Sequence, residues 1–155
     1  MKIEITEHHA PVPIDESAVR TYAAWIMERV SGLCPQRRWT ELSVVLTDDS
    51  IREINQRWFG RDRVTDVISF DYPDPPDGLT GTGEVIINLA QALGEGRERE
   101  SPDREFALYL AHGCHHLTGA DDQTPDDKQA MLSLEETWVD QAIAENHCGP
   151  FFQHS

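Results

Sequence analysis

The sequence has few basic residues: 13 Lys and Arg stand against 28 Asp and Glu, giving a formal net charge of −15. Because Lys and Arg supply most of the non-specific affinity for nucleic acids, this charge argues against a protein that binds nucleic acid over its whole surface. The cations are unevenly distributed. Eight of the thirteen lie between Arg20 and Arg63, whereas residues 121–155 hold Lys128 alone against eight carboxylates. One end of the molecule could therefore face an anion that the other end repels.

Long apolar runs and paired cysteines are also absent. No stretch approaches the roughly 18 apolar residues of a membrane span, and the first sixteen residues contain no apolar core of a signal peptide. Cys34, Cys114 and Cys148 are widely spaced and form no CxxC pair, which argues against a disulfide framework or a thiolate zinc site. We therefore expect a cytoplasmic protein with reduced thiols.

Several well-known catalytic motifs are missing. The chain contains no GxSxG, P-loop or GxGxxG, so nucleophilic Ser or Cys catalysis has no local support. It also shows no internal repeat and no linker that would divide it. At 155 residues, its length suits a single domain with one core.

Apolar periodicity divides the chain into strands and helices. We expect strands over residues 2–6, 41–47, 65–72 and 83–88. We expect helices over residues 16–33, from 51, from 89, from 102 to 119 and from 125. Two polar runs are expected to be irregular, PDPPDGLTGTG as a turn-rich loop and EGRERESPDRE as a solvated connection.

The stretch HGCHHLTGADD carries possible metal ligands across the end of a predicted helix. His112 and His116 are four residues apart, so their imidazoles lie on one helix face and can converge on one ion. Gly119 is a natural helix stop, and a reversal there would bring Asp122 within reach as a third ligand. Three protein ligands plus water are typical of catalytic zinc, although a lone His-x-x-x-His also occurs without metal. His115 could be a surface residue or a donor that supports a ligand.

Four arginines occur in the twelve residues from Arg52 to Arg63. Such a cluster is usually a solvated polar face. Because the surrounding protein is so acidic, a loop that faces an anion is a competing interpretation.

These pieces together resemble the YbeY family of bacterial endoribonucleases and rRNA maturation factors, and the likeness extends over nearly the whole chain. Family members carry an Asn, then a Thr-Asp-Val-Leu-Ser-Phe-like strand, a Gly-Asp or Gly-Glu strand, and the helix His-Gly-x-Leu-His-Leu-x-Gly. The matching positions are Asn55, Thr65 to Phe70, Gly83-Glu84, and His112 to Gly119.

The resemblance implies an α/β (α+β) fold in one domain over residues 1–155, with a mixed four-stranded sheet, about five helices and a zincin-like metal helix. It implies one zinc ion per chain, held by His112, His116 and Asp122. It also implies a metal-dependent endoribonuclease that cuts single-stranded RNA in 16S rRNA 3′-end maturation and ribosome quality control. The expected partners are rRNA of the small ribosomal subunit and, given the acidity of the chain, basic ribosomal proteins, with no membrane.

The chain departs from the family pattern at two positions. Asp122 stands where the third ligand is often a His; a carboxylate still binds zinc but should lower its Lewis acidity relative to three imidazoles. Phe59 stands where many members carry an Arg. Arg57, Arg61 or Arg63 could supply a phosphate-facing cation instead, with Arg61 the first choice, or the cation is dispensable here.

Two other functions compete with RNA cleavage. A metalloprotease would share the helical His-x-x-x-His, but zincins need a Glu directly after the first His, and this chain has Gly113 there. A ribosome-assembly factor would bind its partners without cutting and use the metal to brace its fold.

Overall fold

The apolar, β-branched segments of the chain pair into one four-stranded sheet in the computed structural model, which describes residues 1–152. The strands are β1 (Lys2–Glu7), β2 (Arg38–Thr47), β3 (Val67–Pro73) and β4 (Thr80–Asn88). Their order is β1-β2-β4-β3; β1, β2 and β4 are parallel, and β3 is antiparallel to β4. The predicted mixed α+β sheet is confirmed. Residues 153–155 of the predicted domain lie outside the described residues.

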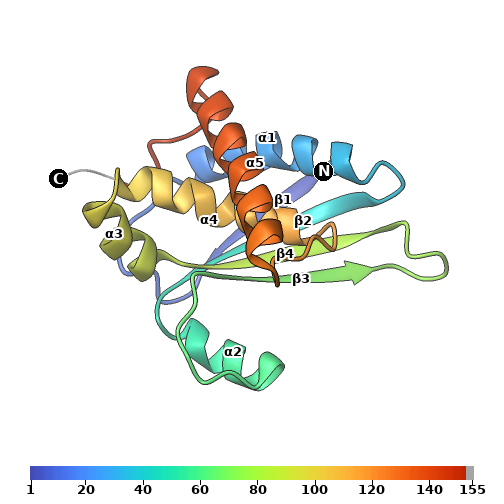
Figure 1. Cartoon of the computed structure of the whole chain (residues 1–155), viewed down its shortest axis with the longest axis horizontal. Helices are drawn as coiled ribbons and strands as arrows, with labels where there is room; N and C mark the ends of the chain where they lie inside the picture. Colours follow the sequence, from blue (N-terminus) through green and yellow to red (C-terminus); the bar gives the residue numbers. More distant parts are fainter. Residues whose placement is uncertain (153–155) are drawn as a thin grey trace.

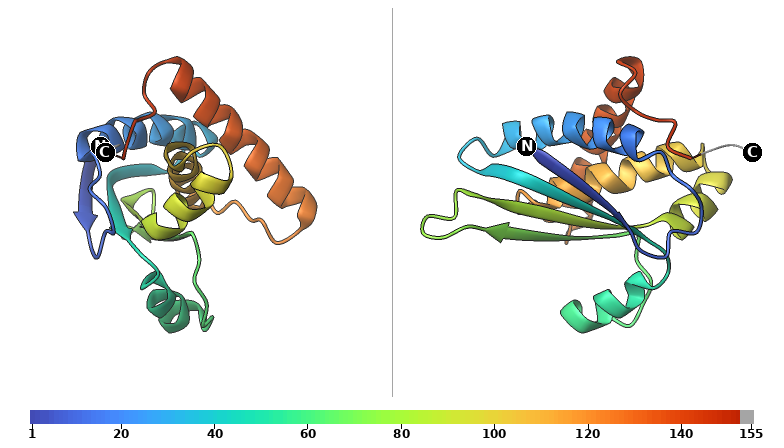
Figure 2. Two further views of the ribbon diagram at one scale, coloured as in Figure 1. Left: turned by 90° about the vertical axis from the view of Figure 1, so that its left-hand side faces the viewer. Right: turned by 180° about the vertical axis from the view of Figure 1, so that it is seen from behind.

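Within residues 1–152, five helices accompany the sheet, as predicted: α1 (Glu16–Leu33), α2 (Ile51–Phe59), α3 (Leu89–Glu98), α4 (Pro102–His116) and α5 (Pro125–Ala144). α1 and α4 cover one face of the sheet and α5 crosses over α4, whereas α2 stands on the opposite side (Figure 1, Figure 2). The side chains of Asp15, Ser101 and Thr124 cap α1, α4 and α5, each accepting a backbone N–H three residues ahead. No helix within residues 1–152 is both long and apolar enough to cross a membrane.

Two apolar clusters hold the layers together. The larger lies between the sheet and the helices α1, α4 and α5, and the chain's last described residues complete it. Phe151 and Phe152 are buried, and the ring of Phe151 packs edge-on against Phe106 with centroids 4.8 Å apart. The smaller cluster joins α2 to the other face of the sheet through Ile51, Ile68 and Ile86.

Two predicted irregular segments are partly regular. β4 begins at Thr80, inside the predicted loop, because it is a central strand with β2 on one side and β3 on the other. Gly81 suits that place, since a Cβ there would collide with the carbonyl oxygen of Tyr72. The predicted solvated connection is also wrong in part. α3 continues to Glu98, and Glu105 is buried, with its carboxylate 3.0 Å from the guanidinium of Arg99.

Candidate active site

The histidines stand on α4, and a glycine sets how closely this helix approaches the sheet. A Cβ at Gly113 would lie 2.5 Å from Cγ1 of Val85 and 2.8 Å from Cγ2 of Val67, so a larger residue would push the layers apart. The carbonyl oxygen of Gly113 also accepts a hydrogen bond of 2.7 Å from Oγ of Ser69. These contacts fix the C-terminal half of α4 on β3 and β4, and with it the position of His112.

Three side chains converge at the C-terminal end of α4. The Nε2 atoms of His112 and His116 lie 2.9 Å apart, and Oδ2 of Asp122 lies 3.5 Å from the first and 3.6 Å from the second. Gly119, with a φ of 84°, allows the reversal that brings Asp122 back. Ligand atoms held about 2.1 Å from one ion at tetrahedral angles lie about 3.4 Å apart. The three side chains could therefore bind a metal ion and leave a fourth position open.

Acceptor oxygens behind the two imidazoles set their orientation. Nδ1 of His112 lies 2.9 Å and 3.1 Å from the two carboxylate oxygens of Glu135, and Nδ1 of His116 lies 3.1 Å from the carbonyl oxygen of Ala120. An ionised carboxylate and a carbonyl only accept hydrogen bonds, so each Nδ1 must carry the proton and donate it. In the neutral form each ring then carries its lone pair on Nε2, where a cation could bind, and Oδ2 of Asp122 lies within 3.6 Å of both Nε2 atoms.

Burial and neighbouring charges move the pKa values of these groups in different directions. Burial lowers the pKa of His116 and the adjacent His112 lowers it further, which favours the neutral ring that a metal ion needs. Burial also lowers the pKa of His112, but the hydrogen bond to Glu135 and its negative charge outweigh burial and raise the net pKa. Burial raises the pKa of Glu135, and its hydrogen bonds to His112 and His115 outweigh this and lower it. Glu135 therefore remains ionised, and a proton competes with a cation for His112.

Glu135 is the part of the site that we did not predict from the sequence. Its side chain is 1% exposed and also lies 2.8 Å from Nδ1 of His115. It shares a face of α5 with the buried Met131 and Trp138. In the sequence, a carboxylate within such an apolar stripe is the one pattern that could have indicated a buried charge with a partner. Of the two roles considered for His115, the structure excludes the surface one. The ring is buried against Trp138, with centroids 5.2 Å apart.

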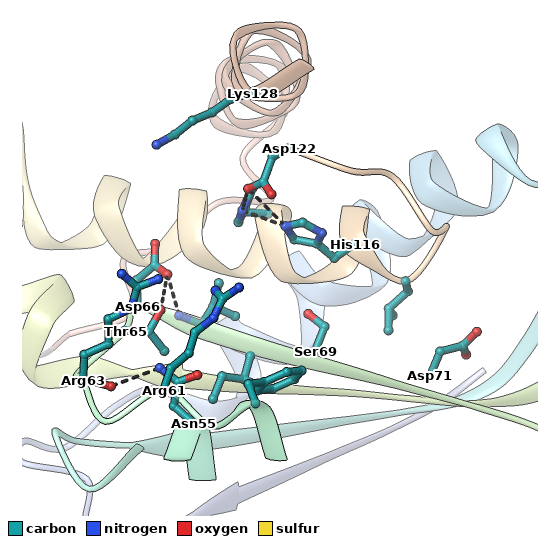
Figure 3. A pocket seen from close by; sticks show the side chains of 15 residues that line it. Asn55, Arg61, Arg63, Thr65, Asp66, Ser69, Asp71, His116, Asp122 and Lys128 are labelled. Carbon is teal, nitrogen blue, oxygen red and sulfur yellow. Dashed lines mark hydrogen bonds and ion pairs between the residues drawn. The ribbon is translucent and has the colours of Figure 1, made fainter. Parts of the chain in front are cut away.

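A cleft of about 620 Å³ opens beside the converging ligands. The loop after α2, strand β3, the end of α4 and the first turn of α5 supply its walls (Figure 3). Among the predicted cations, Arg61 and Arg63 line this cleft and Arg57 does not. Lys128 of α5 adds a third cation, and Phe59 forms part of the wall. The cleft therefore combines a candidate metal site with three basic side chains and with the carboxylates of Asp66 and Asp71.

The loop that carries these arginines is held in place by its own hydrogen bonds. Nδ2 of the buried Asn55 donates to the carbonyl oxygen of Arg63 at 3.0 Å, and Gly60, with a φ of 66°, ends α2 (Figure 3). Arg52 is neutralised by Asp62 at 2.6 Å. Within residues 1–152, no ion pair occupies the guanidinium of Arg57, Arg61 or Arg63. Their charge is available to an anion in solution.

Comparison with known proteins finds sequence similarity to one family over most of the chain. A family model described as Endoribonuclease YbeY matches residues 3–142. Proteins named Endoribonuclease YbeY include one from Myxococcus xanthus, which is 34% identical over 142 residues covering 87% of this chain. Another, from Anaeromyxobacter sp. strain Fw109-5, is 33% identical over 153 residues, covering 94% of this chain and 77% of that protein. This chain spans only 48% of the length of the Myxococcus protein.

A solved structure supports the fold. The solution structure of TM1509 from Thermotoga maritima superimposes with a TM-score of 0.61, covering 96% of this chain and 93% of that one. At 21% sequence identity, this likeness bears on the architecture alone.

Proposed function

The chain belongs to the YbeY family of endoribonucleases, and from this premise we propose that it cleaves single-stranded RNA with a zinc ion held by His112, His116 and Asp122. One observation carries the proposal. The two imidazole Nε2 atoms and a carboxylate oxygen converge in a cleft that also presents unpaired cations. Both features would favour cleavage of RNA, a Lewis acid at the scissile phosphate and positive charge along the backbone.

Different groups of the protein would have different roles in such a reaction. An ion bound by the three ligands would supply Lewis acidity, either activating water or stabilising the charge that develops on the phosphoryl oxygens. Glu135 and the carbonyl oxygen of Ala120 hold the protons on Nδ1 of the two histidines, so each Nε2 keeps its lone pair for the ion. Arg61 and Arg63 lie in the same cleft and would neutralise the phosphates that flank the cut, which favours entry of an anionic strand into an acidic protein.

We further propose that the natural substrate is 16S rRNA, cut during 3′-end maturation and ribosome quality control in the cytoplasm. The family membership supports this role. Basic ribosomal proteins would be attracted electrostatically to the exposed acidic residues of α5, which include Asp126, Asp127, Glu136 and Asp140.

A cleavage assay tests the proposed activity. We expect the zinc-loaded protein to cut a 5′-labelled, unstructured 20-nucleotide RNA and to leave the matching duplex intact. The His116→Ala variant should lose both the metal and the activity, whereas His8→Ala, a histidine exposed on the surface, should retain both. Rapid cleavage by His116→Ala that has been shown to lack metal would refute the assignment. The product end separates two routes, since a 2′,3′-cyclic phosphate would exclude direct hydrolysis by water.

A ribosome-assembly factor with a structural metal is the second candidate. The observation that favours it is Glu135, which ties the ligand His112 to the buried His115 and so connects the metal site to the packing of α4 on α5. For that role, removing zinc would lower the melting temperature sharply while the loaded protein showed no RNA cleavage. Peptide hydrolysis is not proposed, because Gly113 packs against the sheet where a zincin places its general base.

A further inference from the structure

Four aromatic rings form a continuous row beside the cleft. Trp58 and Phe59 end α2, and Phe70 and Tyr72 lie on β3. Phe59 stacks on Phe70 with centroids 5.9 Å apart, Phe70 stacks on Tyr72 at 6.2 Å, and Trp58 meets Phe70 edge-on at 5.7 Å. We call these four residues the ring row.

The ring row is exposed to an unusual degree. Trp58, Phe59 and Tyr72 are 65%, 51% and 50% exposed, whereas the other three tryptophans of the chain are 3–6% exposed. Single exposed apolar side chains are common on proteins, but a contiguous group of large rings marks a site of interaction. The hydroxyl of Tyr72 donates a hydrogen bond of 3.1 Å to the carboxylate of Glu84, which fixes the direction of the ring without covering it. The row is therefore held in one arrangement with its rings open to solvent.

The ring row is continuous with the cleft. Phe59 belongs to both, because it stacks on Phe70 and also lines the cleft beside Arg61 and Arg63. Arg57 lies one residue before Trp58, and in the described part of the chain none of these three arginines forms an ion pair. Aromatic rings with open faces next to unpaired cations are the combination that binds single-stranded nucleic acid, in which the bases stack on rings and the phosphates meet the charges.

We propose that the ring row is a base-stacking surface that holds single-stranded RNA where it leaves the cleft. This inference rests on the proposed function, and it identifies the residues that bind the RNA strand beyond the scissile bond. Bases stack on Trp58, Phe59 and Tyr72, while the backbone follows Arg61 and Arg63. Every base has a π face, so the surface tolerates any sequence, but it rejects a duplex because paired bases are stacked on one another. The preference for single strands thus comes from the rings, and the cations add salt-dependent affinity.

A direct binding assay tests the ring row separately from cleavage. The probes are fluorescein-labelled oligo(dT) of 12 nucleotides, which lacks the ribose 2′-OH and is run on a gel after the titration to show that it is intact, and a 12-residue abasic strand with the same phosphates. We expect the full-length, zinc-loaded protein to bind oligo(dT) at least about fivefold more tightly than the abasic strand, because each stacked base contributes substantially. Phe59→Leu and Tyr72→Leu should each weaken oligo(dT) binding about fivefold or more and leave abasic binding unchanged. Ile143→Ala, which removes an apolar side chain that is 47% exposed on α5, is the matched control and should change neither.

Tryptophan fluorescence gives a second readout in the same titration. Because Trp58 is the exposed tryptophan, oligo(dT) should quench emission in the parent protein and should not do so in Trp58→Leu. Equal binding of oligo(dT) and the abasic strand, or unchanged binding by the leucine variants with folded circular dichroism spectra, would overturn the inference. So would a dimer in sedimentation that these variants dissociate, since the rings would then be a contact between two copies of the chain.

The outcomes separate this inference from the proposed function. A protein that binds through the ring row but never cuts RNA would refute the nuclease assignment alone. If the parent protein cuts RNA but its leucine variants bind oligo(dT) with parental affinity, the stacking role of the ring row alone would be refuted.

Discussion

The carboxylate of Glu135 should control how tightly the site binds its metal. Glu135→Gln keeps the size of the side chain but replaces a doubly accepting group with one oxygen and one NH₂. Glu135 accepts from Nδ1 of both His112 and His115, so the amide can serve one ring and presents a donor to the other. If the amide NH₂ faces His112, the proton of that ring must move to Nε2, where it blocks the lone pair that would bind zinc.

The size of the effect follows from burial. Glu135 is 1% exposed, so water cannot replace the lost acceptor. Removing such a group behind a metal ligand weakens metal binding about 10- to 100-fold, equivalent to about 1.4–2.7 kcal/mol. The loss should depend on pH. Glu135 raises the pKa of His112, so in the parent protein a proton competes with zinc at a higher pH than it would at a histidine without this partner. In the glutamine variant this competition begins at lower pH. The difference in zinc affinity between the parent and the variant should therefore narrow as the pH falls from 8 to 6.

Zinc affinity is measured by competition with a chromophoric chelator at pH 8 and pH 6. Glu136→Gln, the exposed neighbour on the same helix, is the matched control and should bind zinc like the parent. Affinities within twofold of one another for parent and Glu135→Gln at pH 8 would refute the reasoning. A difference that stays constant between the two pH values would refute its electrostatic part.

Three further predictions concern packing, substrate charge and the thiols. Gly113→Ala should destabilise the protein by about 1–3 kcal/mol in urea unfolding because its Cβ would meet two valine side chains, whereas Gly94→Ala, with open space around it, should be neutral or slightly stabilising. Arg61→Ala should weaken single-stranded RNA binding and reduce the slope of log K against log salt by about 0.7, while Arg52→Ala, already paired with Asp62, should change the slope less; equal slopes for the two variants would count against the role of Arg61. A thiol reagent at pH 8 should leave Cys114 unlabelled in the folded protein, because complete burial blocks access and raises the pKa of its thiol to about 12; labelling of Cys114 before unfolding would contradict its buried position.

The sequence was sufficient to predict local parts of the site. His112 and His116 are one helical turn apart, and the stop at Gly119 lies within three residues of the second histidine, so the spacing put Asp122 within reach as a third ligand, and the family resemblance selected this set of three. Glu135 lies 23 residues from His112 along the chain and meets it only because α5 packs across α4. No local pattern encodes that crossing.

Tertiary pairing also overrode local signals in the sheet. The run from Pro73 to Gly83 is rich in Pro and Gly and favours a loop, yet Thr80 to Gly83 form the start of a central strand because partners on both sides hydrogen-bond to it. The ring row likewise could not be predicted from local sequence. Trp58 and Phe59 are separated from Phe70 by a loop whose path the sequence does not specify, so their stacking appears only in the folded chain.

Reconstitution of RNA cleavage with metal tests whether His112, His116 and Asp122 hold a catalytic zinc ion. The protein is stripped with a chelator, dialysed, and titrated with zinc while the initial rate of single-stranded RNA cleavage and the bound metal are measured together. We expect no cleavage without metal and a rate that rises linearly to a plateau at one zinc per chain, with no rise for His116→Ala. Full-speed cleavage by the stripped protein, or zinc binding at one equivalent with no cleavage at any zinc concentration, would refute a zinc-dependent nuclease.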